Sequence, residues 1–388
     1  MKRIYLDYAA TTPTAPEVVH AMLPYFTEQF GNPSSTHSFG QESKAATEEA
    51  RAKIALLLGA ALEEIVFTSG GTESNNFALK GVVYANEHKG NHIITSAIEH
   101  PAILEPCKFL ETKGFTVTYL PVDHDGLVNP DDVQNAITEK TILISVMHAN
   151  NDIGTIEPIA EIGRIARDRG IVFHTDAVQT FGHLPINVDE VNVDLLSMSA
   201  HKLYGPKGIG ALYVRKGTRI IPFLHGGEQE RRRRASTENV PAIVGFGKAV
   251  EIAQARMSEE ARQLTGLRDT FIKRLFDKID HIWLNGHPTR RLPNHVNVSI
   301  ELVEGESLLL NLDLEGIAAS TGSACSASNS QPSHVLLALG VARELAYSSL
   351  RFTLGRDTQA EELDRVADVL AAIVRKLRVL SLLSRGRL

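Results

Sequence analysis

Residues 170–180 read GIVFHTDAVQT and residues 193–202 read VDLLSMSAHK, and the pattern that they share decides the fold. In both stretches, a compact run of Ile, Val, Leu, Phe or Met ends in small or polar residues. Short apolar runs without alternation are typical of strands buried on both faces, as in a parallel sheet covered by helices. Residues 91–100 (NHIITSAIEH) and 141–151 (TILISVMHANN) repeat the pattern. The sequence therefore predicts an α/β fold with a mostly parallel central sheet.

Helical segments alternate with these strands from about residue 45 to residue 215. Residues 46–59, for example, have apolar residues at helical spacing and end on Gly59, a residue type favoured at helix C-termini. Because helices that connect parallel strands cover the faces of the sheet, we expect helices on both sides of it. Ligands of such sheets bind beyond the carboxyl ends of the strands. The polar residues at these ends are therefore expected to converge on one pocket.

The pattern changes after about residue 255. A charged helical stretch at 260–279 is followed by an alternating segment at 295–300 and a terminal helical stretch at 360–377. These elements suggest a smaller α+β domain packed on the first one. We therefore predict two domains with the following bounds: residues 15–255 for the large domain, and residues 1–14 together with 256–388 for the small domain.

The composition is that of an ordinary globular protein, with 388 residues, 43% of them hydrophobic, and a net charge of −6. Binding to nucleic acid or to a membrane surface needs an excess of Lys and Arg, so neither is expected. Small molecules and proteins are the expected partners. Two cysteines cannot form a disulfide framework, and the sequence offers no signal peptide and no unbroken apolar run that would span a membrane. A reducing cytoplasm is the expected location.

Lys202 directly follows one of the predicted buried strands, which is an unusual place for a lysine. Most lysines are solvated surface groups, and this is the simpler interpretation for any lysine taken alone. A lysine at the end of a core strand, however, is partly desolvated, and an uncharged amine can act as a base or form a Schiff base. Ser199 and His201 lie beside it in the sequence and are suited to binding a phosphate.

Asp176 ends another predicted strand, and Gln179 lies about one helical turn further along. A carboxylate at this position has three interpretations. It could serve as a metal ligand, as the N-cap of a following helix, or as the partner of a cofactor cation. The N-cap is the simplest of the three, because it requires no bound ligand. The choice among them depends on what else lies in the same pocket.

The turn TSGGTESNN at residues 68–76 supplies a third feature. Gly70 and Gly71 permit a sharp turn, and Thr72 begins a predicted helix whose N-terminal amides attract an anion. The turn lacks the Gly-Lys-Ser/Thr ending of a Walker motif and is not G-x-G-x-x-G, so a nucleotide site is disfavoured. A strand-end amine, a strand-end carboxylate and an anion-binding turn are the groups that pyridoxal phosphate needs.

Four histidines, at positions 100, 148, 174 and 201, lie near predicted strand ends, so a zinc site has to be considered. None has the paired spacing of zinc ligands on one helix, and the two thiols do not form a C-x-x-C pair. No metal site is predicted. His100 is better placed to stack on a flat ring or to transfer a proton, and a structural histidine is the alternative.

The two cysteines lie in different surroundings. Cys107 is in the apolar stretch AILEPCKFL, where it fits the buried face of a helix. Cys325 lies in STGSACSASNSQPSH, residues 320–334, among small polar residues that are typical of an exposed, flexible loop. The sequence therefore predicts that the Cys325 thiol is displayed for chemistry. A run of four arginines, 231–234, is interpreted as a solvated loop, with an anion clamp or a partner contact as the alternative.

Taken in order, the motifs of the chain resemble those of the cysteine desulfurases of the class-V aminotransferase group. The resemblance extends over nearly the whole chain and is to the branch with the longer cysteine loop. The motifs that establish it are LDYAATTP, GNPSSTHSFG, TSGGTESNN, EHPA, HANNDIGT, HTDAVQT, SAHKLYGPKGIG, STENV, PNHVNVS, EGES, GSAC and LRFTLG. It implies a fold-type I transferase that depends on pyridoxal phosphate.

The resemblance also implies roles for individual residues. Lys202 would hold pyridoxal phosphate covalently, Asp176 would pair with its pyridine nitrogen, and His100 would stack on its ring. The remaining implied ligands are Gln179 and Asn151 for the ring hydroxyl or the nearby substrate; Gly71, Thr72, Ser199 and His201 for the phosphate, joined by Thr237 from the other subunit of a homodimer; and Arg351 for the substrate carboxylate, with Arg356 as its alternative.

The implied reaction converts L-cysteine to L-alanine. Lys202 would remove the α-proton, and the Cys325 thiolate would attack the substrate sulfur and keep it as a persulfide. The sulfur would pass to an acceptor protein, such as a scaffold for iron-sulfur clusters, or to a thiolation enzyme. The alternatives are a selenocysteine lyase, another class-V lyase or aminotransferase in which Cys325 is incidental, and a non-catalytic scaffold that binds sulfur-transfer proteins.

Overall fold

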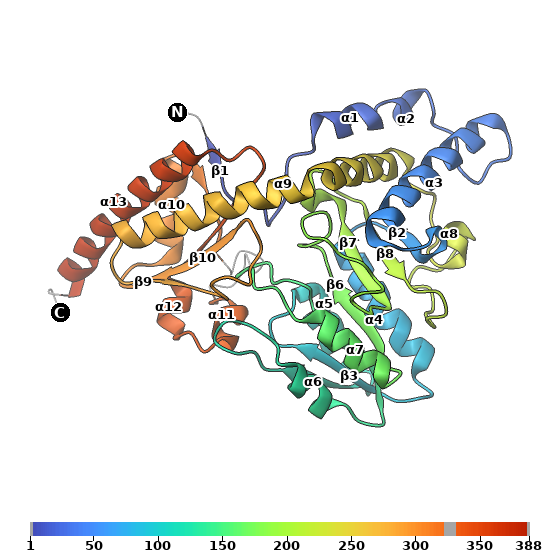
Figure 1. Ribbon diagram of the computed structural model, residues 1–388, viewed down its shortest axis with the longest axis horizontal. Helices are drawn as coiled ribbons and strands as arrows, with labels where there is room; N and C mark the ends of the chain where they lie inside the picture. The colour runs from blue at the N-terminus through green and yellow to red at the C-terminus, as the bar shows by residue number, and fades with distance from the viewer. Residues whose placement is uncertain (1–2, 322–330, 386–388) are drawn as a thin grey trace.

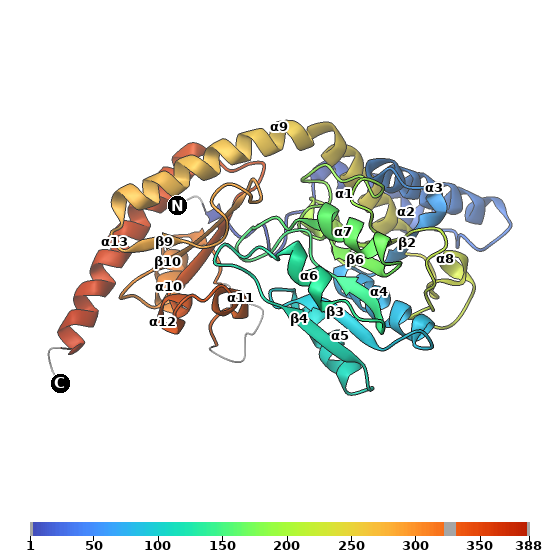
Figure 2. The same ribbon diagram turned by 60° about the horizontal axis from the view of Figure 1, so that its bottom comes forward.

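A computed structural model describes residues 3–321 and 331–385 and shows two regions joined by one long helix (Figures 1 and 2). The large region, on the right of Figure 1, is built around a seven-stranded sheet. The small region, on the left, is built around a three-stranded sheet. Helix α9 (Val240–Lys278) runs along both regions.

The seven-stranded sheet is parallel at every neighbouring pair except the two pairs that β8 makes. Its strands, in spatial order, are β2 (Ile65–Thr68), β8 (Gly210–Val214), β7 (Leu195–Ser199), β6 (Val172–Asp176), β5 (Thr141–Ser145), β3 (His92–Ser96) and β4 (Thr116–Leu120). The predicted α/β fold with a mostly parallel central sheet is confirmed.

Helices cover both faces of this sheet, which explains why its strands are apolar without alternation. Neighbouring strand residues point to opposite faces, so Leu195 belongs to one hydrophobic cluster and Leu196 to the other. The helices around the sheet are α3 (Ser38–Leu58), α7 (Ile159–Asp168) and α9 on one side, α4 (Gly71–Asn86) and α5 (Pro101–Glu111) on the other, and the short helices α1 (Pro16–Met22), α2 (Pro24–Thr27), α6 (Pro130–Ala136) and α8 (Gln229–Arg232).

Strand β8 is a part of the sheet that the sequence pattern did not predict. The chain leaves β7, makes the short 3-10 turn η2 (Ala200–Lys202), and returns between β7 and β2. At its start, β8 passes so close to the glycine turn that a Cβ on Gly210 would lie 2.7 Å from Cα of Gly70. Glycine at position 210 therefore permits the contact that places the turn beside the end of β7.

The small region contains two short sheets and a separate hydrophobic core. In the three-stranded sheet, the central strand β10 is antiparallel to both of its neighbours, and β1, near the N-terminus, forms a parallel pair with β11. The elements of this region are β1 (Ile4–Tyr5), β9 (Ile282–Leu284), β10 (His295–Ile300), α10 (Gly305–Leu314), β11 (Ile317–Ala318), α11 (His334–Ala338), α12 (Arg343–Tyr347), β12 (Ser349–Thr353) and α13 (Ala360–Arg385).

Helix α9 begins about twenty residues before the helical stretch that the sequence predicted at 260–279. Asn239 caps it by accepting a hydrogen bond from the Ala242 backbone amide, and Pro241 lies in its first turn, where proline is tolerated. The predicted domain boundary at residue 255 falls inside this helix. Ala253 packs in the core of the large region and Leu264 in the core of the small region.

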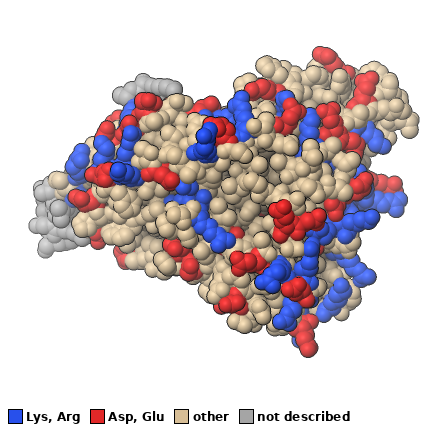
Figure 3. Space-filling model, viewed as in Figure 1, with Lys and Arg blue, Asp and Glu red and all other residues tan. Residues whose placement is uncertain are grey.

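Charged side chains of both signs are interspersed over the face seen in Figure 3. Within residues 3–321 and 331–385, no helix combines the length and the apolar character that crossing a membrane requires.

Candidate active site

A cavity of about 340 Å³ lies where the strand ends of the large region face the small region. It is lined by residues that end or follow the parallel strands, by the first residues of α4, by the segment of residues 7–10, by Ser320 and by one residue of β12. The structure brings these predicted site residues together around it: Gly71, Thr72, His100, Asn151, Asp176, Gln179, Ser199, His201, Lys202 and Arg351.

Lys202 reaches the cavity because β7 ends at Ser199 and the short turn η2 follows at once. Its Nζ donates hydrogen bonds to the backbone carbonyl oxygens of Ala9, at 2.5 Å, and Ala10, at 2.8 Å. The side-chain amide of Gln179 also donates to the Ala9 carbonyl, at 3.0 Å. The segment near the N-terminus therefore holds the amine at the wall of the cavity.

Asp176 is buried at the end of β6, with only 7% of its surface exposed. Its Oδ2 accepts a hydrogen bond from the side-chain amide of Asn75 at 2.6 Å, and its Oδ1 accepts one from the backbone amide of Val178 at 2.9 Å. A turn at residues 178–180, not a helix, follows it, so the helix N-cap interpretation does not apply. Two donors therefore orient a carboxylate at the cavity wall.

His100 is the N-cap of α5, and its Nδ1 accepts a hydrogen bond from the backbone amide of Ala102 at 3.0 Å. Burial lowers the pKa of the imidazole; Lys202 and His334 lower it further, while Asp176 acts in the opposite direction. The ring is therefore neutral near pH 7. Because Nδ1 is an acceptor, the proton of the neutral ring is on Nε2.

The glycine turn precedes α4, which begins at Gly71. Gly70 has φ 153°, a conformation that glycine adopts readily, and Ser199 and His201 lie beside it along the cavity. Burial, together with Lys202 and Lys207, lowers the pKa of His201 to about 4, and its Nδ1 contacts the Thr11 hydroxyl at 3.1 Å. The first amides of α4 therefore face a neutral imidazole and hydroxyl groups, which suits an anion.

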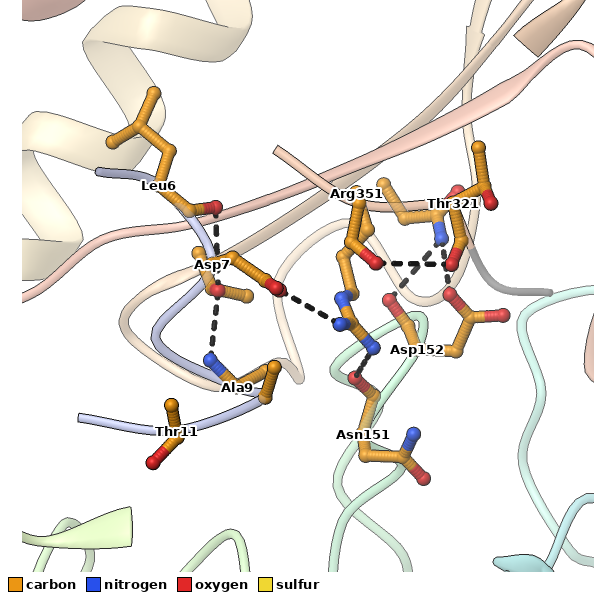
Figure 4. Close-up of polar contacts among 12 residues, drawn as sticks. Leu6, Asp7, Ala9, Thr11, Asn151, Asp152, Thr321 and Arg351 are labelled. Atoms are coloured by element: carbon orange, nitrogen blue, oxygen red, sulfur yellow. Dashed lines mark hydrogen bonds and ion pairs between the residues drawn. The ribbon is translucent and has the colours of Figure 1, made fainter. Parts of the chain in front are cut away.

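Arg351 reaches the opposite side of the cavity from β12 and is 6% exposed (Figure 4). One of its terminal nitrogens bonds Asp7 Oδ1 at 2.9 Å, and the other donates to the carbonyl oxygen of Asn151 at 3.2 Å. The alternative residue, Arg356, does not line the cavity, because its guanidinium stacks on the Tyr204 ring at 3.8 Å. Of the two arginines, Arg351 is therefore the one that lines the cavity.

Glu99 is a fully buried carboxyl group next to His100. Its Oε1 accepts hydrogen bonds from the Ser96 hydroxyl at 2.7 Å and the Met147 backbone amide at 2.8 Å. Burial raises its pKa to about 8 in spite of these donors, and the charges of Asp176 and Glu157 add to the increase. Glu99 is therefore mostly protonated at neutral pH and adds little negative charge to that of Asp176.

Replacing Glu99 by Gln is expected to stabilise the protein at high pH. A glutamate ionises near pH 4.5 in the unfolded chain and near 8 in the folded chain, so the stability that Glu99 contributes is full below pH 4.5 and is lost as the pH rises towards 8. Chemical denaturation at pH 5 and pH 8 measures the effect. The free energy of unfolding of the Gln variant, relative to that of the original chain, is expected to increase between these values. A difference that does not change with pH would contradict the pKa assignment.

Two predicted site residues are not among those that line the cavity. Thr237 lies exposed just before α9. Cys325 falls within residues 322–330, outside the described part of the chain.

The arginine run, residues 231–234, is largely paired within the chain, and Arg234 bonds Glu73 in the first turn of α4 at 2.8 Å. The prediction of a solvated loop is therefore wrong for Arg234.

The sequence analysis missed two residues of the site, Asn75 and Asp7. Asn75 lies in the predicted motif TSGGTESNN, but nothing in the motif marks this asparagine as the partner of Asp176. Asp7 lies in LDYAATTP, two residues after the end of β1, and a carboxylate close to a strand end is the signal by which Asp176 was found. The same signal applied to Asp7 would have placed it in the site.

Among the other histidines considered as zinc ligands, His174 has both ring nitrogens in contact with serine hydroxyls. His174 is buried within β6 between the hydroxyls of Ser145 and Ser197, and burial lowers its pKa to about 3. Within residues 3–321 and 331–385, no three His, Cys, Asp or Glu side chains gather as metal ligands would.

The family pattern described as aminotransferase class-V matches residues 4–366 of the chain. Among curated proteins, cysteine desulfurase IscS of Dictyoglomus turgidum is 60% identical over 382 residues, covering 98% of this chain and 97% of the relative. Cysteine desulfurase IscS of Methanosarcina thermophila is 59% identical over 380 residues, covering 98% of this chain and 94% of the relative.

Solved structures are similar over most of the chain. A NifS-like protein superposes with a TM-score of 0.91 at 38% identity, covering 96% of this chain and all of the other. SspA in complex with cysteine superposes with a TM-score of 0.81 at 40% identity, covering 91% of this chain and 99% of the other.

Proposed function

The chain belongs to the class-V aminotransferase family and is a cysteine desulfurase, and on this premise we propose that its cavity holds pyridoxal phosphate and L-cysteine together. The observation that supports this most directly is that Lys202, Asp176 and the N-terminus of α4 line one cavity. An amine, a carboxylate and helix amides are the groups that the aldehyde, pyridine nitrogen and phosphate of the cofactor need.

The residues present fit this cofactor. Asp176 is held by two donors and is buried, so it offers a fixed negative charge to a ring nitrogen. A Cβ at position 71 would lie 2.7 Å from a methyl group of Val178, so glycine is the residue that lets the first turn of α4 pack this closely against the cavity wall. The neutral His100 suits stacking on a ring better than a charged one, because a charged ring would be costly to desolvate. When bound, pyridoxal phosphate supplies an electron sink for the charge that develops at the α-carbon.

The residues of the chain have distinct roles in the proposed reaction. Lys202 would hold the cofactor covalently, and its amine, when free, would remove the α-proton of L-cysteine. Arg351 binds the substrate carboxylate, for which its forked donors are suited. Gln179 and Asn151 contact the ring hydroxyl or the substrate. Gly71, Thr72, Ser199 and His201 bind the phosphate, joined by Thr237 of a second subunit.

Cys325 then takes the sulfur. Its thiolate attacks the sulfur of L-cysteine, so a sulfur–sulfur bond forms on Cys325 while the carbon–sulfur bond of the substrate breaks. The electron pair of the broken bond stays with the carbon, which takes up a proton and becomes the methyl group of L-alanine. The reaction needs no further oxidant or reductant. A cysteine with an ordinary pKa of about 8.5 is only a few per cent ionised at neutral pH, so a neighbouring base is needed to accept its proton.

We also propose that the chain acts as a homodimer. A group of large apolar side chains on α1–α3 of the large region is between 50% and 65% exposed and includes Leu23, Phe26, Phe30 and Phe39. Exposed apolar groups of this kind mark protein interfaces. Thr237 is exposed as well, as a residue that contributes to a second subunit must be.

The persulfide is proposed to pass to an acceptor protein in a reducing cytoplasm, such as a scaffold for iron-sulfur clusters or an enzyme of thiolation. The sequence around Cys325 supports this, because its small polar residues suit a thiol that must meet two different partners. The identity of the curated relatives as cysteine desulfurases supports L-cysteine as the source of the sulfur.

Two measurements on the purified protein test the proposal. Protein supplied with pyridoxal phosphate is expected to show a visible absorbance band that borohydride reduction converts into a stable adduct on Lys202. After addition of L-cysteine, peptide mapping is expected to find the persulfide on Cys325. Protein that stays colourless, or a persulfide on another residue, would overturn the assignment. Turnover of L-selenocysteine with none of L-cysteine would support the selenocysteine lyase instead.

A further inference from the structure

A buried carboxylate, Asp152, lies at the junction of the two regions. It is 2% exposed and belongs to the turn that follows β5. Its Oδ2 accepts a hydrogen bond from the Ser333 hydroxyl at 2.6 Å, and its Oδ1 accepts one from the side-chain amide of Asn297 in β10 at 2.8 Å. One carboxylate therefore connects a turn of the large region, a strand of the small region, and the segment that leads into α11.

The same junction contains the proposed clamp for the substrate carboxylate (Figure 4). Asn297 is the direct cross-strand partner of Arg351. Arg351 donates to the carbonyl oxygen of Asn151, the residue before Asp152. Its backbone also exchanges two hydrogen bonds with Ser320, at 2.7 and 3.1 Å. The position of Arg351 is thus fixed by the same few groups that surround Asp152.

These contacts bracket the cysteine in the sequence. Ser320 precedes Cys325 by five residues and Ser333 follows it by eight. Ser320 is bonded to Arg351 and Ser333 to Asp152, so both sides of the Cys325 segment are attached at the junction that holds the clamp. A third contact lies beside them, because Nε2 of His334 bonds the backbone carbonyl of Glu99 at 3.0 Å.

We propose that Asp152 is a positioning residue for sulfur transfer. By accepting the Ser333 hydroxyl, it fixes one end of the Cys325 segment relative to Arg351, and so relative to the substrate that Arg351 binds. The inference rests on the proposed role of Cys325 as sulfur acceptor. Its consequence is that weakening the contact slows the step that uses Cys325 and leaves the earlier step at Lys202 unchanged.

Ser333 has a second contact that a test must separate from this one. It is the N-cap of α11, and its hydroxyl accepts the backbone amide of Leu336 at 3.5 Å. Asn and Asp are both good N-caps and have nearly the same shape. Asn can donate to Asp152 from its amide, whereas Asp has no donor when ionised and faces Asp152 with a like charge. The pair Ser333→Asn and Ser333→Asp therefore keeps the cap and changes only the contact with Asp152.

Two readouts on the full protein with bound pyridoxal phosphate distinguish positioning from general damage. The first is exchange of the α-proton of L-alanine for deuterium, which needs Lys202 and no sulfur. The second is the rate of persulfide formation on Cys325 in a single turnover with L-cysteine. The Asp variant is expected to lose about tenfold or more in the second rate, because displacement of a reacting group by about 1 Å costs on the order of 10²-fold. Its first rate is expected to match that of the original chain, and the Asn variant is expected to keep both rates.

Equal persulfide rates in the Asn and Asp variants would overturn the inference, and so would a loss of α-proton exchange as large as the loss of persulfide formation. A second pair of variants checks the partner side. Asp152→Ala, which has no acceptor for the Ser333 hydroxyl, is expected to slow persulfide formation, and adding Ser333→Ala to it is expected to slow the reaction little further, because both changes remove the same contact. Glu157→Gln, a change at another buried carboxyl close in sequence, is the control and is expected to change neither rate.

A failure of the proposed function gives a different result from a failure of this inference. If the original chain exchanges the α-proton but forms no persulfide on Cys325, the role of Cys325 fails. If it forms the persulfide and the Asp variant forms it equally fast, only the role of Asp152 fails.

Discussion

Replacing Cys325 by Ala is expected to lower the production of L-alanine from L-cysteine by on the order of 10³-fold or more, while the cofactor stays bound. The thiolate of Cys325 is the group that breaks the carbon–sulfur bond in the proposed reaction, and alanine has no atom that can replace it. The groups proposed to hold the cofactor lie at or after the strand ends, on α4 and, for Thr237, just before α9, and none of them is among residues 322–330. The visible absorbance and the α-proton exchange are therefore expected to remain.

The other cysteine provides the control for this prediction. Cys107 is fully buried in α5, and burial raises its pKa to about 12, so it is a neutral thiol at physiological pH. Replacing Cys107 by Ala is expected to cost some stability and to leave the persulfide on Cys325. Alanine production that continues in the Cys325 variant would show that this thiol is incidental, as it would be in an ordinary class-V lyase or aminotransferase.

Replacing Lys202 by Ala is expected to abolish both alanine production and α-proton exchange, with a loss on the order of 10⁴-fold or more. Its Nζ is the amine held at the cavity wall by the carbonyl groups of Ala9 and Ala10. Removing it takes away both the proposed anchor of the cofactor and the proposed base for the α-proton. Deuterium exchange into L-alanine and alanine release from L-cysteine measure the two losses separately.

Lys202→Arg is the matched control. Arginine keeps a positive charge and donors for the two carbonyl groups, but it stays protonated and does not form a Schiff base under physiological conditions. It is expected to be as inactive as the Ala variant. Activity in the Arg variant would mean that position 202 needs only a positive charge. Together, the Lys202 and Cys325 variants separate the two steps of the reaction. The Lys202 variant is expected to stop both α-proton removal and sulfur transfer, and the Cys325 variant only sulfur transfer.

The sequence predicted the sheet and the convergence of Asp176 and Lys202 because each follows a buried apolar run, and the carboxyl ends of parallel strands meet at one edge. It did not predict that β8 runs antiparallel, since the direction of a return strand depends on packing beyond the local pattern. The position of Asn75 against Asp176 was also not predictable, because it depends on how α4 rotates against the sheet.

Residues that come from distant parts of the chain were the hardest to place. Asp7 reaches Arg351 because β1 pairs with β11, a contact across more than three hundred residues. Thr237 was predicted to act in a second subunit, which no single chain displays. Asp152 and Ser333 had no signal of their own, because a buried bond between two ordinary polar residues leaves no local pattern in the sequence.

Helix α9 couples the stability of the two regions. It has 39 residues and extends about 58 Å at 1.5 Å per residue, and its only proline is in the first turn. Its N-terminal half packs in the core of the large region and its C-terminal half in the core of the small region. Neither core can melt without exposing part of the apolar surface of a helix that the other core still holds. We therefore expect the protein to unfold as one cooperative unit, even though the two regions have separate hydrophobic clusters among the described residues.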